Sequence, residues 1–236
     1  TWALAVEGRH PLFFADAVLS GERTIRSAWS QAPGGISKGA GRLVSPRAST
    51  APELDGRTGD SIWQGFPGDR AAALFPLVPG PQRPAPVGRF MSCHDEKNLY
   101  LAFRIDAPPA GGAPGKPQWG TDDGVEAAFQ FADPARGRKT FLVHGFRGGR
   151  CEAEVKRSTA PEDSADFEKS LRFAAASLPT GWSCELAIPL ASLGTAAQGA
   201  GELLFNAGGL LMRSGERQWF AWVNTGGANY DVSRAG

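Results

Sequence analysis

The clearest pattern in the chain is a two-residue alternation of apolar and polar side chains, which recurs between residues 98 and 223. In NLYLAFRID, Leu99, Leu101 and Phe103 are apolar, whereas Asn98 and Arg104 occupy the alternate positions. Successive side chains of a β-strand point to opposite faces, so the alternation predicts strands with one buried face. Further strands are predicted at VEAAFQF, TFLVHGF, CEAEV, LRFAAASL, SCELAIPL, LLFNAGGLLM and RQWFAWVN.

The spacing of these segments predicts the fold class. The strands are short and are separated by stretches rich in Gly and Pro, and the only good helix candidate is a short one near PEDSADFEKS. The sequence contains no long amphipathic helix and no internal repeat. We therefore predict an all-β protein, a two-sheet antiparallel β-sandwich of the jelly-roll type.

The organised pattern occupies residues 51–236. Residues 1–50 hold two apolar patches, WALAV and PLFFADAVL, followed by a polar stretch rich in Gly, Ser and Ala. We interpret residues 1–50 as an N-terminal extension with a few strands, or as the tail of an upstream domain. The chain starts directly in WALAV without a visible signal peptide, so an upstream segment is expected to have been removed or left out.

The charge of the chain bears on its binding partners, and its cysteines bear on disulfide formation. The formal net charge is +1, with acids and bases mixed along the chain, which argues against nucleic acid or an anionic membrane as the main partner. No apolar run is long enough to span a bilayer. The cysteines Cys93, Cys151 and Cys184 lie in predicted strands. They are expected to be buried and to pack as small hydrophobic residues. If the protein is secreted, one disulfide between two of them is the alternative.

Catalytic patterns are weak. Asp122, Asp123 and Glu126 lie close together, as acid and base pairs can, but no second, distant acid stands out. Asp is also common at turns for its local hydrogen bonding. GWSCE only begins like a nucleophile elbow, and GGAPGKP lacks the spacing and the Ser or Thr of a phosphate loop. We predict that the chain is not an enzyme, with a glycosidase as the weaker alternative.

Metal binding is expected, if at all, to involve calcium. The histidines His10, His94 and His144 are not paired at ligand spacing, which gives little support to a transition metal. Acidic loops that contain Gly supply the oxygen ligands that calcium prefers, so Asp122 and Asp123 are candidate calcium ligands. The alternative is that both are solvated loop acids.

Two aromatic residues differ from the rest. The chain has seven tryptophans, most of which are expected to pack inside the sandwich. Trp119, however, ends the Pro- and Gly-rich loop APPAGGAPGKPQWG just before Asp122 and Asp123, and Tyr230 lies in the polar run NTGGANYD. Loop aromatics beside hydrogen-bonding side chains suit a sugar, whose apolar face packs on the ring. For Trp119, packing onto the core is the alternative.

Six stretches, in order, resemble the family 9 carbohydrate-binding modules and their relatives in the DOMON-like superfamily. They are LDGRTGDSIWQ, HDEKNLYLAFRI, WGTDDGVEAAF, GWSCELAIPLASL, FNAGGLLMR and WVNTGGANYDVSRAG, and they cover roughly residues 52–236. The resemblance implies a jelly-roll-like sandwich that binds glycans without cleaving them. It also implies an accessory module, alone or beside other domains, of a larger secreted bacterial glycan-active or surface protein.

The resemblance also implies roles for single residues. Family members enclose a terminal sugar between two aromatic residues and contain structural calcium. Trp119 falls on the first aromatic position and Tyr230 on the second, where Trp is commoner, while Glu126 matches an acid that hydrogen-bonds the sugar. Gln130 shares the strand face of Glu126, which makes it a further candidate contact.

The sequence departs from the family pattern at two places. Leu142 stands where the sugar-binding type has an Arg, and Gly227 stands where an Asn is expected, although Asn224 and Asn229 are near and are candidate sugar contacts. The fold is therefore expected to carry over, and weaker or altered sugar binding is expected. A structural or interaction sandwich that has lost sugar binding is one alternative.

A haem-binding cytochrome domain is the other alternative, because the same superfamily includes members that ligate haem through Met and His. Met91, Met212 and His144 are the candidate ligands here. With only two methionines, both in apolar strands, core packing is the better interpretation, and no haem is expected.

Overall fold

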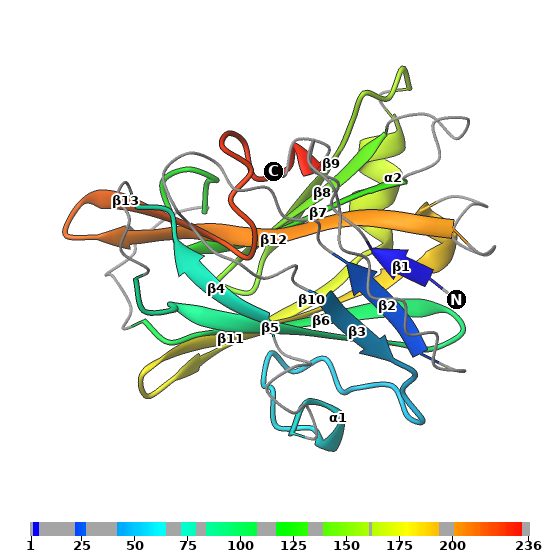
Figure 1. Ribbon diagram of the computed structural model, residues 1–236, viewed down its shortest axis with the longest axis horizontal. Coiled ribbons are helices and arrows are strands. Elements are labelled where there is room, and N and C mark those ends of the chain that lie inside the picture. Colours follow the sequence, from blue (N-terminus) through cyan, green and yellow to red (C-terminus); the bar gives the residue numbers. More distant parts are fainter. Residues whose placement is uncertain are drawn as a thin grey trace.

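The structure is a computed structural model, and it is a β-sandwich in which two sheets face each other (Figure 1). It describes residues 2–4, 22–26, 42–64, 72–78, 84–107, 117–131, 139–160, 162–193 and 201–232. The two sheets are named sheet A and sheet B below. The predicted all-β sandwich is confirmed.

Sheet A has five principal strands, each antiparallel to its neighbours. In spatial order they are β9 (Cys151–Lys156), β8 (Thr140–Phe146), β7 (Gly124–Phe131), β12 (Gly201–Arg213) and β13 (Glu216–Ala221). Sheet B is also antiparallel. Its strands are β10 (Arg172–Leu178), β11 (Gly181–Pro189), β6 (Asn98–Ile105), β5 (Gly88–His94) and β4 (Ala72–Pro76). Because β4 also pairs with β13, it joins the two sheets along one side.

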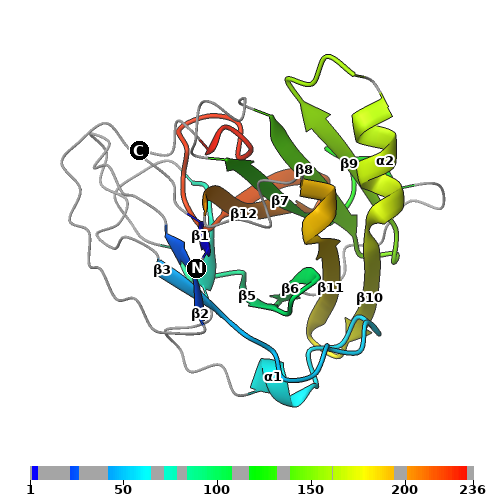
Figure 2. The same ribbon diagram turned by 90° about the vertical axis from the view of Figure 1, so that its right-hand side faces the viewer.

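Three short strands near the N-terminus extend the sandwich (Figure 2). They are β1 (Trp2–Leu4), β2 (Glu22–Arg26) and β3 (Arg42–Pro46). β1 runs parallel to both β12 and β2, and β2 runs antiparallel to β3. The few strands expected within residues 1–50 therefore pair with sheet A through β1.

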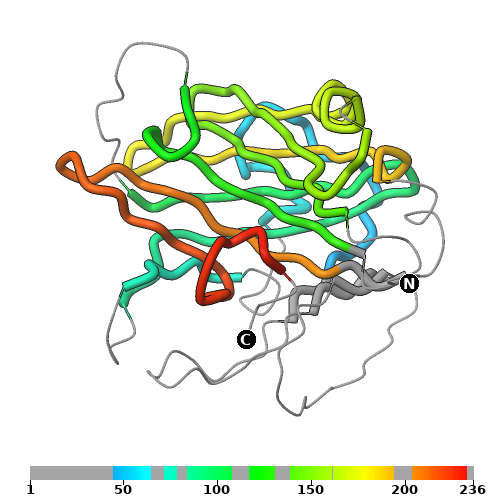
Figure 3. Tube along the Cα trace, turned by 90° about the horizontal axis from the view of Figure 1, so that it is seen from above, coloured from blue at the N-terminus to red at the C-terminus, as the bar shows by residue number. Residues whose placement is uncertain are grey.

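Helix α2 (Glu162–Ser170) forms at the short helix predicted from PEDSADFEKS and packs beside β9 (Figure 3). The β9 backbone N–H groups of Val155 and Ala153 donate to Ser164 Oγ at 2.9 Å and to Glu168 Oε2 at 3.1 Å. Phe167 packs edge-on against Phe141 under the same helix. The helix thus satisfies donors at the edge of sheet A that would otherwise invite pairing with another chain.

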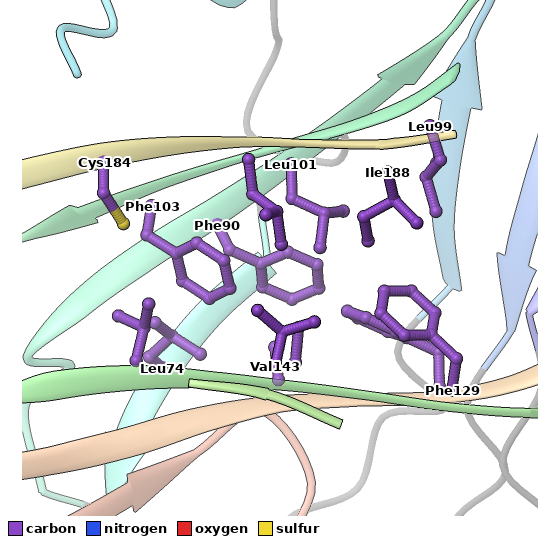
Figure 4. Packing of buried hydrophobic residues seen from close by; sticks show 14 of the residues in the cluster. Leu74, Phe90, Leu99, Leu101, Phe103, Phe129, Val143, Cys184 and Ile188 are labelled. Carbon is purple, nitrogen blue, oxygen red and sulfur yellow. The ribbon is translucent and has the colours of Figure 1, made fainter. Parts of the chain in front are cut away.

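The core lies between the sheets, and it includes Leu99, Leu101 and Phe103, which the alternation assigned to the buried face (Figure 4). Phe90 of β5 reaches across to Phe205 of β12, with ring centroids 5.4 Å apart, and Phe205 meets Phe129 at 5.0 Å. Each buried Phe stabilises the fold by roughly 1.5–3 kcal/mol through removal of apolar area from water. Cys93, Cys151 and Cys184 are all free thiols in strands.

The outer face of sheet B is crossed by residues 47–64, named the strap here. It contains the short helix α1 (Ser61–Gln64), seen below β5 in Figure 1. Ala48 N–H donates to the carbonyl of His94 at 2.7 Å. Trp63 is buried in a small apolar cluster that also contains Met91. The strap spans the expected boundary between residues 50 and 51, and that boundary stays a prediction.

A buried carboxylate fastens the strap to sheet B. Glu185 of β11 is fully buried and accepts hydrogen bonds from the Trp63 indole at 2.7 Å and from Gly56 N–H at 2.9 Å. A third donor is Asp55 N–H at 3.2 Å. Burial raises the pKa of Glu185 to about 7, although these three donors act in the opposite direction. Among the described residues, no helix is both long and apolar enough to cross a bilayer.

The raised pKa makes stability depend on pH. Between the ordinary glutamate value and about 7, the folded state binds the Glu185 proton more tightly than the unfolded state, so stability falls as pH rises through this window. We expect the free energy of unfolding to fall by on the order of 2 kcal/mol between pH 5 and pH 8. Urea denaturation across this range should show that Glu185→Gln removes the fall. The exposed Glu216→Gln should retain it, and equal slopes for the two variants would contradict the assignment.

Candidate functional site

Apart from Asn224, the predicted sugar-contacting residues lie on the outer face of sheet A, opposite the sheet that carries the strap. Strand register fixes a row of neighbours across this face: Glu152 of β9, His144 of β8, Glu126 of β7 and Gly208 of β12. Val125 and Phe129 point into the core, so Glu126 faces outward as the alternation predicted. The row brings together residues that are more than 80 positions apart in the chain.

Glu126 is the most enclosed member of the row, with only 3% of its surface exposed. Its Oε2 lies 2.9 Å from His144 Nε2, and its Oε1 accepts a hydrogen bond of 2.9 Å from Asn229 Nδ2. The other ring nitrogen of His144, Nδ1, lies 3.2 Å from Glu152 Oε1. A carboxylate therefore faces each ring nitrogen of His144.

Trp119 lies flat against this histidine. The two rings are nearly parallel, at 7° with centroids 3.9 Å apart, so they are stacked face to face. A Cβ added at Gly124 of β7 would come within 3.1 Å of the Trp119 ring, so the absence of a side chain there lets the indole approach the sheet. Phe146 also meets Trp119 edge-on, with centroids 6.4 Å apart. The loop tryptophan is therefore seated on the outer face of sheet A.

A second tryptophan adjoins the first. Trp219 of β13 meets Trp119 at a centroid distance of 5.8 Å and an interplanar angle of 64°. Trp219 is 38% exposed, which is a large fraction for an indole, and Trp119 is half-buried. The two indoles meet edge to face at the surface of the sheet, and the pair is named the aromatic corner here.

Asn229 and Tyr230 reach the same face from residues 223–232, named the C-terminal loop here. Asn206 of β12 is fully buried and donates from Nδ2 to the Asn229 Oδ1 at 2.7 Å and to the Val223 carbonyl at 3.0 Å. Its Oδ1 accepts from the backbone N–H groups of Ala207 at 3.0 Å and Val223 at 3.2 Å. One side chain thus fixes the loop against β12.

Tyr230 is half-buried in contact with the sheet. It packs against a cluster of Ala128, Leu142, Leu204 and Val232 on the outer face. Lys156 Nζ lies 4.6 Å from the centre of its ring. Trp119 and Tyr230 therefore lie on the same face of one sheet, and a cleft between them stays a prediction.

Gln130 and Asn224 occupy different settings. Gln130 is 3% exposed and pairs in register with Leu204 and Thr140, two rows along the sheet from Glu126. Asn224 is exposed, and its Oδ1 accepts a hydrogen bond of 2.9 Å from Gly226 N–H within its own turn. The structure therefore brings Glu126, Asn229 and Trp119 together through His144, and it leaves Asn224 at the surface of the loop.

Asp122 and Asp123, which precede β7, accept hydrogen bonds from backbone N–H groups. Asp122 Oδ2 accepts from Gln118 N–H at 2.8 Å, and Asp123 Oδ1 accepts from Met212 N–H at 2.7 Å. Burial raises the pKa of Asp123 above its ordinary value. In the part of the chain that is described, no three acidic, His or Cys side chains are grouped as a metal site would need. Calcium binding stays a prediction, which a comparison of melting in calcium and in EDTA can test.

The haem candidates are also separated. Both ring nitrogens of His144 face carboxylates, which leaves neither as a ready ligand for iron. Met91 is buried beneath the strap on sheet B, with Cys93 and Trp63, and not beside His144 on sheet A. Met91 and His144 therefore lie on different sheets, and the expected absence of haem stays a prediction.

Two groups in this site were missed from the sequence. His144 was considered only as a haem ligand, and Trp219 was grouped with the packing tryptophans. The alternation in RQWFAWVN already put Trp219 and the buried Phe220 on opposite faces. The pairing of Glu126 with His144, however, needs the register of β7 and β8, which the sequence does not display.

Solved structures share this fold. A carbohydrate-binding module of family 9 from Caldicellulosiruptor kristjanssonii, solved with glucose, aligns with a TM-score of 0.55 and 14% identity over 80% of this chain and 91% of that one. The fold is that of a family 9 carbohydrate-binding module. The same kind of module from that organism, solved with cellotriose, gives a TM-score of 0.53 and 14% identity over 79% and 88%. The sequence itself matches no protein-family model and no curated protein.

The close approach of the C-terminal loop to β12 can be tested at Gly208. A Cβ there would lie 2.5 Å from Asn229 Nδ2 and 2.6 Å from the Phe220 carbonyl oxygen, so one of them must move. We expect Gly208→Ala to lower the free energy of unfolding by about 1–3 kcal/mol in chemical denaturation. Gly227→Ala, in the same loop with open space around it, should change stability by less than about 0.5 kcal/mol. Equal stability of both variants would contradict the described seating of the loop.

Proposed function

We propose that this chain is a non-catalytic carbohydrate-binding module whose ligand contacts the outer face of sheet A. Its fold supports this proposal, because modules with the same fold have been solved with glucose and with cellotriose. The predicted sugar-contacting residues Trp119, Asn229 and Tyr230 all lie on or beside that face.

The aromatic corner of Trp119 and Trp219 carries the proposal. An indole as exposed as Trp219, placed against a second indole, leaves apolar surface in water that a ligand can cover. The C–H face of a sugar ring suits such a surface, and its hydroxyls suit polar groups at the rim. Trp219 therefore joins Trp119 as a proposed stacking residue.

The rest of the site is proposed to run from the corner toward Tyr230. Tyr230 with Lys156 offers a hydroxyl and an ammonium group farther along the same face, and exposed Asn224 offers an amide. Gln130 is too enclosed to reach a ligand as the side chains stand, and its role as a contact depends on movement of its neighbours. Weaker or altered binding follows from Leu142, which is 2% exposed and cannot replace a charged contact.

The setting of the acids on this face supports a binding role. Among the described residues, the acid best placed for chemistry, Glu126, has both oxygens engaged by His144 and Asn229. We therefore propose an accessory module of a secreted bacterial glycan-active or surface protein, which would hold its parent protein on a glycan.

A structural or interaction sandwich is the second candidate. One observation favours it: Glu126 and Leu142, at two positions where the family resemblance implies sugar contacts, are almost fully buried. In that case the aromatic corner would contact another protein surface, and soluble sugars would not bind.

Binding measurements on tryptophan variants test the proposed function. We expect Trp119→Ala and Trp219→Ala each to weaken the binding of a soluble oligosaccharide by about tenfold, because an aromatic contact contributes roughly 0.5–1.5 kcal/mol beyond area burial. Isothermal titration with glucose, cellotriose and a panel of other oligosaccharides measures this. Val78→Ala, which changes the other large exposed apolar side chain among the described residues, should bind as the parent does.

Two results would contradict the proposal. A folded parent chain that binds none of the panel would favour the interaction sandwich. Binding that is unchanged in both tryptophan variants would show that the ligand lies elsewhere.

A further inference from the structure

A continuous series of side-chain contacts crosses the outer face of sheet A and connects the C-terminal loop to Trp119. In spatial order its members are Asn206, Asn229, Glu126, His144 and Glu152, and the series is named the relay here. We infer that Glu126 is a positioning residue that couples the C-terminal loop to Trp119, and not a direct contact of the ligand.

The surroundings of Glu126 leave a ligand little access. The residue is 3% exposed, and each oxygen already has a partner at 2.9 Å, His144 on one side and Asn229 on the other. A ligand hydroxyl could reach the carboxylate only by displacing one of these two side chains. Glu126 therefore acts on the site through them.

The orientation of Asn229 is fixed by its other neighbour. Its Oδ1 accepts a hydrogen bond of 2.7 Å from Asn206 Nδ2, so its Nδ2 is the atom that faces Glu126. Asn206 cannot reverse its own amide, because its Oδ1 accepts from the N–H groups of Ala207 and Val223 while its Nδ2 donates to carbonyl oxygens. The loop end of the relay consequently has one favourable arrangement of donors and acceptors.

The other end of the relay controls the indole. His144 is held between Glu126 and Glu152, and its ring plane sets the plane of Trp119, which stacks on it within 7°. If the contact with Glu126 is lost, only Glu152 still holds the ring, so the ring and the indole stacked on it can shift. A change at Asn229 should thus alter the position of Trp119 through Glu126 and His144.

The functional consequence rests on the proposed carbohydrate binding. Side chains that are already ordered before the ligand arrives lose less conformational entropy on binding, so affinity benefits from preorganisation. The relay would hold Trp119 and the C-terminal loop, which lie more than 100 residues apart in the chain, in the arrangement that the ligand meets.

Asn229→Asp tests the coupling with little change in shape. The new carboxylate retains an acceptor for Asn206 but places oxygen against Glu126 Oε1, where the donor was. Asn224→Asp is the matched control: it adds the same charge to the same loop and retains the acceptor for Gly226 N–H. The readout is the indole N–H signal of Trp119 in a ¹⁵N-correlated NMR spectrum, assigned by its disappearance in Trp119→Phe. We expect Asn229→Asp to shift this signal and Asn224→Asp to leave it in place.

Two substitutions at Glu126 separate positioning from direct contact, and they serve if Asn229→Asp does not fold. Glu126→Gln can still accept from Asn229 and donate to a neutral His144, so the Trp119 signal should stay near its position and cellotriose affinity should fall less than about threefold. Glu126→Ala breaks the relay and should shift the signal and weaken binding at least tenfold. Loss of affinity in both variants with an unmoved Trp119 signal would overturn the inference in favour of a direct contact.

The two readouts keep this inference separate from the proposed function. If the parent chain binds neither cellotriose nor any other glycan of the panel, the proposed function fails, but the Trp119 signal still reports the coupling. If the signal is unmoved in both Asn229→Asp and Glu126→Ala, the relay does not couple the two elements, whatever the affinity for glycans.

Discussion

The burial of the Glu126 carboxylate constrains the arrangement of the side chains around it on the outer face of sheet A. A charged group removed from water is costly unless an opposite charge and hydrogen bonds compensate it. Here the compensation comes from His144 on the neighbouring strand and from Asn229 on the C-terminal loop. Each of these partners is itself held, by Glu152 and by Asn206. The position of Trp119 therefore depends on the side chains that surround the buried Glu126 carboxylate.

Sheet B also contains a buried carboxylate, but the groups that hydrogen-bond to it are different. Glu185 is as deeply buried as Glu126, but its partners are an indole and backbone N–H groups of the strap, all of them neutral. Burial raises the pKa of Glu185 by more than these donors lower it. The hydrogen bonds to Glu185 hold the strap across sheet B. The partners of Glu126 instead connect it to Trp119 at the surface of sheet A. The two faces of one sandwich are thus suited to different tasks.

The sequence predicted the fold better than the site because the two depend on different ranges of interaction. The alternation along β7 assigns Val125 to the core and Glu126 to the outer face from neighbouring residues alone, and the short helix at residues 162–170 has an equally local signal. The contact of Glu126 with His144 depends on the register between β7 and β8. The burial of Glu126 depends on Asn229, which arrives about 100 residues later. A strand pattern shows which side chains point outward, but it cannot show what will cover them.

The manner in which Asn206 holds the C-terminal loop has a consequence for protein engineering. Three of its hydrogen bonds to that loop are to main-chain atoms, the N–H and carbonyl of Val223 and the carbonyl of Asn229. Main-chain groups are present whatever the side chain, so this anchor tolerates changes of residue type in the exposed stretch that contains Asn224, Gly227 and Ala228. A combinatorial library at those positions could therefore vary the rim beside Tyr230 while the attachment of the loop is retained, which makes the loop a natural place to select new recognition properties.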